Sequence, residues 1–288
     1  MGSAVKKVII PVAGYGTRFL PATKAQPKEM LPVVDKPILQ YIVEEAVASG
    51  IEDVIIVTNL QKRAAEDHFD RMPELEAWLE KQGKTEALKE VRKITDLAKF
   101  VYIRQKGPYG NGSPVLEAKH VIGNEPFAVI WGDDLVVGQP PRLKQLIDVY
   151  EKYGHPVLTA YRVDDEGTKR YGMLDATLVE GNVYEVQGIV EKPGPADAPS
   201  RLASLGGYVL TPDIFKALEQ TPLGKDNELW LVDALARLRH TKPIYACEVQ
   251  GTYYDVGSKL GWLTANVALG LQHPELGAPF RRSLQALL

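Results

Sequence analysis

The chain has 288 residues, of which 45% are hydrophobic and 25% charged, a composition typical of a globular protein with a substantial core. Its formal net charge of -3, from 34 basic and 37 acidic residues, argues against a nucleic-acid-binding protein, which usually carries a strongly basic domain. The sequence shows no signal-peptide pattern and no apolar run of about 18 residues, and its single cysteine, Cys247, excludes an intramolecular disulfide. We therefore expect a cytoplasmic protein that binds neither nucleic acids nor membranes.

Short β-branched runs alternate with amphipathic helical patterns through the first half of the chain. This alternation predicts a mostly parallel sheet with right-handed crossovers. The expected strands are 5–13, 53–59, 99–105 and 126–134, and the expected helices are 38–50, 113–121 and 141–153.

Three later segments complete the predicted organisation. Residues 72–97 are charged and helix-prone, which favours a surface insertion between the second and third strands. After about residue 156 the pattern becomes richer in strands, and we expect antiparallel strands added to the same sheet. Residues 258–287 look helical, with a break near Pro274 and Gly277.

The predicted fold class is α/β, with a mixed, mostly parallel central sheet flanked by helices. The sequence contains no internal repeat, low-complexity tract or obvious linker. We therefore expect a single domain, 1–288, with two lobes, about 1–150 and about 151–288.

The segment AGYGTRFLPATKAQPKEMLPVVDKP (13–37) follows the first strand and combines glycines, cations and prolines. It lacks the GxxxxGK motif of a P-loop and the third glycine of a dinucleotide fingerprint. Pro21, Pro27 and Pro32 exclude the helix that a dinucleotide site needs, because each would cost about 3 kcal/mol in a helix interior. The segment therefore predicts a cationic loop at the sheet edge where open α/β proteins bind ligands.

This loop has the chemistry of a phosphate site. Gly14 and Gly16 allow backbone N–H groups to approach an anion. Arg18 can donate two parallel hydrogen bonds to phosphate oxygens, and Lys28 supplies a compact positive charge. Lys24, on the same loop, is expected to be solvated.

A long signature and six short motifs run in order through nearly the whole chain. The signature is GYGTRFLPATKAQPKEMLPVVDKPILQY (14–41). The motifs are RQK (104–106), GDD (132–134), RYG (170–172), IVEKP (189–193), LGGYVLTPDIF (205–215) and YYDVGSK (253–259). Together they resemble the sugar-phosphate nucleotidylyltransferases, and most closely the bacterial UTP–glucose-1-phosphate uridylyltransferases (UDP-glucose pyrophosphorylases).

The resemblance implies a Rossmann-like nucleotidyltransferase fold and a reaction of UTP with glucose 1-phosphate that gives UDP-glucose and pyrophosphate. It also implies Mg²⁺ as cofactor and a homo-oligomer, a dimer or a tetramer. The attacking phosphate oxygen is already ionised at neutral pH, so no general base is needed, which agrees with five scattered histidines. A thymidylyltransferase, or a uridylyltransferase for another sugar 1-phosphate, is the close alternative. A non-catalytic nucleotide-sensing domain ranks lower, and a dinucleotide oxidoreductase lower still.

The resemblance also assigns roles to individual residues. The N-terminal lobe would hold the nucleotide, and the second lobe, with the C-terminal helices, would hold the sugar. The expected catalytic cations are Arg18, Lys28 and Lys192, and the expected metal ligands are Asp133 and Asp255. The expected nucleotide contacts are Ala13, Gly14, Gly16, Glu29, Gln105 and Gly110. The expected sugar contacts are Gly172, Glu191 and Lys192.

Two segments depart from the family's usual pattern. Residues 110–114 read Gly-Asn-Gly-Ser-Pro where relatives commonly show glycine-leucine-glycine-histidine, and residues 227–235 read NELWLVDAL where a glutamine-leucine-threonine-aspartate pattern is usual. In relatives the first segment lies near the nucleotide and the second beside the sugar pocket. Both are therefore expected to bear on substrate preference. Gln105 does not select the base, because its amide can pair with uracil or with adenine.

Overall fold

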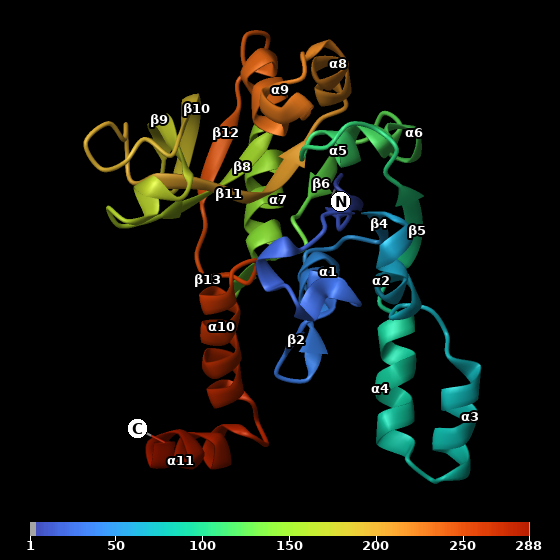
Figure 1. Ribbon diagram of the computed structural model, residues 1–288. Coiled ribbons are helices and arrows are strands. Elements are labelled where there is room, and N and C mark those ends of the chain that lie inside the picture. The colour runs from blue at the N-terminus through green and yellow to red at the C-terminus, as the bar shows by residue number, and fades with distance from the viewer. Residues whose placement is uncertain (1–3, 288) are drawn as a thin grey trace.

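A nine-stranded mixed sheet runs through both halves of the chain in the computed structural model, which describes residues 4–287 (Figure 1). Its strands are β1 (Lys7–Pro11), β4 (Asp53–Thr58), β5 (Lys99–Arg104), β6 (Phe127–Val129), β8 (Val157–Arg162), β9 (Gly172–Glu180), β10 (Val183–Glu191), β11 (Leu202–Leu210) and β12 (Tyr245–Glu248). Their order across the sheet is β5-β4-β1-β6-β11-β8-β12-β10-β9. One continuous sheet therefore joins the residues expected in the two lobes.

The strands of the first half are parallel to one another, and most of the later strands are antiparallel. In β1, Lys7 lies opposite Asp53 of β4 on one side and Phe127 of β6 on the other, both in parallel register. Strand β11 then pairs antiparallel with both β6 and β8, and β10 pairs antiparallel with β12 and β9. The predicted mixed, mostly parallel sheet with added antiparallel strands is confirmed.

Helices cover both faces of the sheet because alternate strand residues point to opposite sides. Ile10 and Ile56 face a core formed with helices α1 (Ile38–Ala48), α2 (Arg63–Asp67) and α7 (Arg142–Tyr153). Ile9 and Ile55 face a second core formed with helices α5 (Ser113–Glu117), α6 (Lys119–Ile122), α8 (Asp213–Gln220) and α9 (Leu231–Leu238). Each buried isoleucine contributes roughly 1.5–3 kcal/mol relative to an exposed one.

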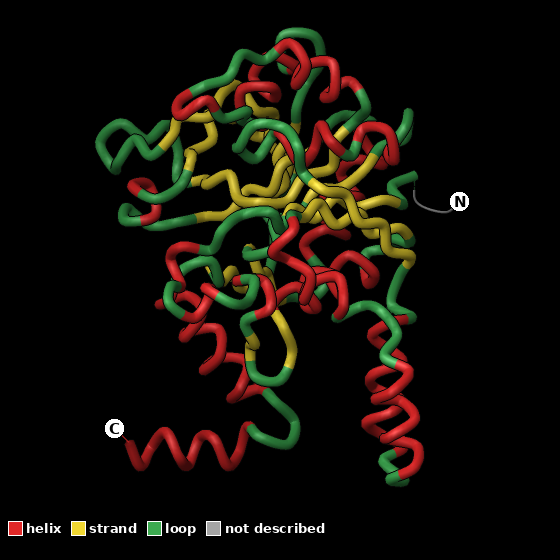
Figure 2. The backbone as a smooth tube through the Cα atoms, turned by 45° about the vertical axis from the view of Figure 1, so that its right-hand side comes forward, coloured by secondary structure: helices red, strands yellow, loops and turns green. Residues whose placement is uncertain are grey.

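Two helical pairs extend from the body of the molecule as separate projections (Figures 1 and 2). One is the predicted insertion, which forms a hairpin of helices α3 (Pro73–Lys81) and α4 (Thr85–Thr95), with Glu76 paired to Arg71 and Arg92. The other is α10 (Lys259–Gln272) followed by α11 (Gly277–Leu287), with the break where the sequence places it. Among the described residues, no helix is long and apolar enough to span a membrane.

The predicted strand 126–134 is corrected by the structure, which divides it in two. Strand β6 ends at Val129, and β7 (Asp134–Val137) leaves the main sheet to pair with β13 (Thr252–Asp255). The Asp134 side chain accepts hydrogen bonds from the Gly206 N–H and the Tyr253 hydroxyl. These bonds satisfy the buried side chain in the position that it takes after the chain has turned away from β6. The turn between the two strands carries Asp133.

The proline-rich loop contains no α-helix, as predicted. It forms three single 3₁₀ turns, Thr17–Phe19, Ala22–Lys24 and Lys28–Met30, and then a short hairpin of β2 (Pro32–Val33) and β3 (Lys36–Pro37). Helix α1 begins directly after Pro37, which suits the first turn of a helix and cannot continue one.

Candidate active site

Four parallel strands end at one edge of the sheet and bring their following loops together. Strand β1 precedes the glycine loop and β4 precedes Asn59. Strand β5 precedes Gln105, and β6 precedes the turn that carries Asp133. The Nδ2 of Asn59 donates to the Ala13 carbonyl at 2.5 Å, and the backbone N–H of Gln105 donates to the Thr58 carbonyl at 2.9 Å. The predicted nucleotide residues of the first lobe thus gather at the carboxyl edge, where α/β sheets bind ligands.

Lys28 and Asp133 form an ion pair at this edge. The Lys28 Nζ lies 2.5 Å from the Asp133 Oδ2, and the two side chains are 20% and 22% exposed. Burial alone would lower the pKa of Lys28, but the carboxylates of Asp133 and Glu29 outweigh it and raise that pKa. Gly16 adopts φ +66°, and a Cβ there would lie 3.1 Å from the Lys28 Cβ, so the glycine turn packs directly on the lysine stem.

Arg18 reaches the turn that follows β13. Its Nη1 donates to the Gly257 carbonyl at 3.1 Å. A Cβ placed on Gly257 would lie 2.5 Å from the Asp133 Oδ2 and 3.3 Å from the Arg18 Nη1. A side chain at position 257 would therefore require the Asp133 carboxylate to move. Gly257 is not among the predicted site residues, although it belongs to the YYDVGSK motif and lies two residues after Asp255.

Asp133 directly precedes β7, and Asp255 ends β13, the strand that pairs with β7. In the antiparallel β7–β13 pair, Asp255 lies opposite Asp134, the residue after Asp133, and both predicted ligands line the same cavity. The described residues contain no group of three or more histidine, cysteine or acidic side chains that could enclose a metal ion. Two carboxylates suit Mg²⁺, which usually takes one or two protein carboxylates and completes its shell with substrate phosphates and water.

Asp134 also lines the cavity, and its hydrogen bonds fasten the β7 turn. Its Oδ2 accepts from the Gly206 N–H at 2.8 Å and its Oδ1 from the Tyr253 hydroxyl at 3.1 Å. Burial, with a further contribution from the Asp133 charge, raises the pKa of Asp134 to about 7. Asp134 therefore anchors the strand that presents Asp133.

The predicted sugar contacts also meet. Gly172 of β9 lies opposite Glu191 of β10, and a Cβ on Gly172 would lie 3.1 Å from the Glu191 Oε2. Lys192 follows with φ +48°, and its Nζ lies 3.3 Å from the Glu191 Oε1. Both charged side chains are more than half exposed, so they remain available to a ligand.

A cavity of about 1160 Å³ joins these two groups of residues. The predicted residues that line it are Arg18, Asp133, Gly172, Glu191, Lys192 and Asp255. Other lining residues belong to motifs or segments noted in the sequence but received no individual role there: Asn111, Tyr171, Trp230, Asp233 and Tyr253. Trp131 packs edge-on against Tyr208 and also lines this cavity.

The predicted nucleotide contacts lie beside the cavity rather than among its lining residues. Gly14 is open, with no atom within 4 Å of an added Cβ, whereas Gly110 at φ +107° is pressed against the Leu229 backbone. Gln105 donates from Nε2 to the Pro108 carbonyl at 3.2 Å. The hydroxyl groups of Tyr15 and Tyr109 meet at 2.9 Å and connect the two loops.

Glu29 is not a free carboxylate at a base pocket. Its Oε2 lies 2.8 Å from the Lys62 Nζ, and the two side chains are only 1% and 5% exposed. Burial raises the pKa of Glu29, although Lys62 and Lys28 oppose that effect. The structure therefore gives Glu29 a partner inside the protein, and its contact with the base stays a prediction.

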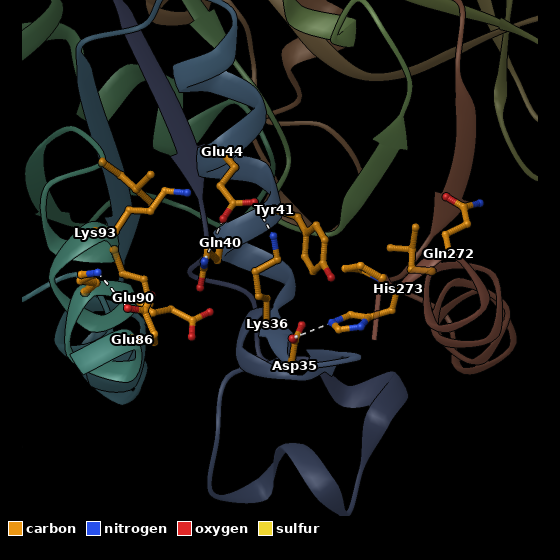
Figure 3. Close-up of a pocket in the computed structure, with 15 residues that line it drawn as sticks. Asp35, Lys36, Gln40, Tyr41, Glu44, Glu86, Glu90, Lys93, Gln272 and His273 are labelled. Carbon is orange, nitrogen blue, oxygen red and sulfur yellow. Dashed lines mark hydrogen bonds and ion pairs between the residues drawn. The ribbon is translucent and has the colours of Figure 1, made fainter. Parts of the chain in front are cut away.

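A second cavity, of about 670 Å³, lies between α1, α4 and the end of α10 (Figure 3). Its charged groups are largely paired with one another. Lys36 lies 2.7 Å from Glu44, and the His273 ring lies 3.2 Å from the Asp35 carboxylate. None of the predicted site residues lines this cavity, which leaves the larger one as the candidate active site.

Comparisons with known proteins agree with this fold. A family model described as nucleotidyl transferase matches residues 7–270. The chain belongs to this family. A UTP–glucose-1-phosphate uridylyltransferase of Bacillus subtilis (strain 168) is 52% identical over 276 residues, which are 96% of this chain and 93% of that protein.

Two solved structures are similar over nearly their whole length. A UTP-bound UGPase from Acinetobacter baumannii is 41% identical with a TM-score of 0.93, covering 99% of this chain and 100% of that one. A UDP-glucose pyrophosphorylase complexed with UDP-glucose is 44% identical with a TM-score of 0.85, covering 93% of this chain and 100% of that one. The Rossmann-like nucleotidyltransferase fold and its single domain are therefore confirmed.

Proposed function

We propose that this chain transfers the uridylyl group of UTP to glucose 1-phosphate, releasing pyrophosphate and forming UDP-glucose. The observation that carries the proposal is the one cavity that brings Arg18 and the carboxylates of Asp133 and Asp255 together with Glu191 and Lys192. The first three suit a triphosphate and its cation, and the last two suit a phosphorylated sugar. The names of the relatives above support the same reaction.

The N-terminal lobe, about 1–150, would bind the nucleotide. The open backbone at Gly14 and the glycine turn at Gly16 would offer N–H groups, and Arg18 and Lys28 would neutralise phosphate oxygens. Lys28 is held in its charged form by Asp133, so its positive charge is present before a substrate arrives. Gln105, with both a donor and an acceptor, would pair with the edge of uracil.

Mg²⁺ would be held by Asp133 and Asp255, whose hard oxygen ligands suit it. When bound, it would supply charge neutralisation on the phosphates of the triphosphate. The chain's own contribution is to fix the two carboxylates through the β7–β13 pairing, with Asp134 fastened to Gly206 and Tyr253.

The second lobe, about 151–288, would bind the sugar phosphate. Glu191 would accept hydrogen bonds from sugar hydroxyls, Gly172 would leave room for the ring beside it, and Lys192 would orient the phosphate. The attacking phosphate oxygen is already ionised, so the residues need only align the two substrates and neutralise charge. A homo-oligomer stays a prediction that light scattering would test.

The test measures pyrophosphate release for pairs of substrates. UTP and dTTP are each combined with the 1-phosphates of glucose, galactose and N-acetylglucosamine, with and without Mg²⁺. We expect the fastest release with UTP and glucose 1-phosphate, and none without a divalent ion. A preference for dTTP or for another sugar would favour the alternative transferase. Nucleotide binding without release from any pair would favour a non-catalytic sensing domain and overturn the proposal.

A further inference from the structure

The loop 109–112 and the approach to α9 are bonded to each other, although they are far apart in the sequence. The Leu229 N–H donates to the Tyr109 carbonyl at 2.8 Å, and the Gly112 N–H donates back to the Leu229 carbonyl at 2.8 Å. A Cβ on Gly110 would lie 2.3 Å from the Leu229 carbonyl oxygen. The loop 109–112 therefore packs directly against Leu229, in the segment that leads into α9.

Asn111 completes this contact at the start of the helix. Its Oδ1 accepts from the N–H of Leu231, the first residue of α9, at 2.8 Å. Trp230, at the N-cap position, makes no side-chain capping bond. One of the N–H groups that the first turn of a helix leaves without an intrahelical partner is satisfied here by a residue 120 positions earlier.

Helix α9 forms one wall of the candidate active site. Its Leu231 is buried in the core, while Trp230 and Asp233 line the cavity. Asn111 lines the same cavity, and in the described structure its Nδ2 forms no hydrogen bond with the protein. A Cβ on Gly224 would lie 3.0 Å from Trp230 and 3.6 Å from the Asp233 Oδ2, so Gly224 packs closely against both side chains. The position of α9 thus decides where Trp230 and Asp233 stand in the cavity.

We propose that Asn111 is a positioning residue for the sugar site. Its Oδ1 holds the N-terminus of α9 so that Asp233, which lines the same cavity as Glu191 and Lys192, can accept hydrogen bonds from the hydroxyl groups of a hexose phosphate. The inference rests on the proposed function for the identity of the ligand. It assigns Asn111 an effect on the affinity for the sugar phosphate and not on the affinity for the nucleotide.

The test compares Asn111→Ala with Asn111→Asp, which keeps an oxygen acceptor for the Leu231 N–H. Wild type and both variants are assayed for kcat and for the KM of each substrate. We expect Asn111→Ala to raise the KM for glucose 1-phosphate about tenfold, the loss of roughly one hydrogen bond, and to leave the KM for UTP within about twofold. Asn111→Asp should restore the KM for glucose 1-phosphate to within about threefold of wild type.

Three outcomes would overturn the inference. They are an unchanged KM for glucose 1-phosphate in Asn111→Ala, an equal rise in both KM values, and an Asn111→Asp variant that behaves like Asn111→Ala. A double variant with Asp233→Ala adds a check, because if Asn111 acts through Asp233 the two losses will not add. Full additivity would contradict the inference.

Calorimetric titration separates this inference from the proposed reaction. Asn111→Ala should weaken the binding of UDP-glucose about tenfold and leave the binding of UDP unchanged. This measurement needs no turnover, so it tests the role of Asn111 even if the wild type releases no pyrophosphate. An absence of pyrophosphate release would refute the proposed function but not the role of Asn111. Two results would refute the role of Asn111. One is an equal affinity of wild type and Asn111→Ala for UDP-glucose, and the other is a wild type that binds UDP but not UDP-glucose. Thermal unfolding of each variant confirms that it is folded.

Discussion

Replacing Lys28 with alanine removes the cation that faces Asp133 at the sheet edge. The cost in stability lies between two limits. A fully exposed ion pair contributes less than about 1 kcal/mol, whereas removing one partner of a buried pair costs about 3–5 kcal/mol. Because each side chain is about one-fifth exposed, we expect a loss of about 2 kcal/mol. For 288 residues the entropy of unfolding then gives a fall in Tm of about 3 °C.

The expected loss of activity is much larger than the loss of stability. A preorganised group that neutralises charge in the transition state is commonly worth about 10²–10³ in kcat. We therefore expect Lys28→Ala to lower kcat for pyrophosphate release by about that factor, while the protein remains folded at 25 °C. Pyrophosphate release under saturating UTP and glucose 1-phosphate, with calorimetric Tm on the same preparation, measures both quantities.

Lys24→Ala is the matched control for this experiment. Lys24 lies on the same loop, is exposed, and forms no ion pair in the described structure, so its removal should change neither kcat nor Tm. A kcat for Lys28→Ala within about threefold of wild type would refute the role given to Lys28. Equal losses in the two variants would show that the loop acts only through its total charge.

Three further predictions test other parts of the structure. Gly257→Ala should lower kcat at least about tenfold, because its Cβ would lie 2.5 Å from the Asp133 carboxylate; a normal kcat in the substrate assay would contradict this close approach. Glu29→Gln should lower the free energy of unfolding in urea by about 3–5 kcal/mol by leaving the Lys62 ammonium buried and unpaired, and a loss below 1 kcal/mol would argue against the pair. The pKa of Glu76 is lowered to about 2 by its two arginine partners, so its stabilisation is complete above about pH 4.5 and is lost as the pH falls towards 2. The difference in Tm between wild type and Glu76→Gln should shrink over that range; a constant difference would refute the assignment.

The sheet and the position of its binding edge could be predicted from the sequence because both depend on local patterns. Continuous apolar runs predict buried strands, and Pro21, Pro27 and Pro32 exclude a helix after the first one. The parallel order of these strands then places the glycine loop, Gln105 and the Asp133 turn at one edge without any knowledge of side-chain contacts. The end of β6 at Val129 was missed because the partners of Asp134 come from β11 and β13, far along the chain.

The contacts that complete the site could not be predicted, because they join elements separated by more than a hundred residues. Arg18 and Gly257 are 239 positions apart, and Asn111 and Leu231 are 120 apart. No periodicity or motif spacing specifies such pairs; they depend on how the turn after β13 and the N-terminus of α9 pack against the edge. The proximity of Asp255 to Asp133 could be expected only from the family resemblance, and the β7–β13 pairing supplies its physical basis.

The site shows how a chain of net charge -3 can hold a place for two anionic substrates. Three lysines each lie beside a carboxylate, and these are Lys28, Lys62 and Lys192. Their positive charges are therefore balanced locally and not by acidic residues elsewhere on the surface. The Lys62 pair is buried and fixes the base of the loop, whereas the Lys28 and Lys192 pairs are progressively more exposed. The Lys192 pair is more than half exposed and holds its partners weakly, so we expect a phosphate to replace its carboxylate at little cost. The Lys28 pair, about one-fifth exposed, lies between this pair and the buried Lys62 pair, so we expect a larger cost for the same exchange there.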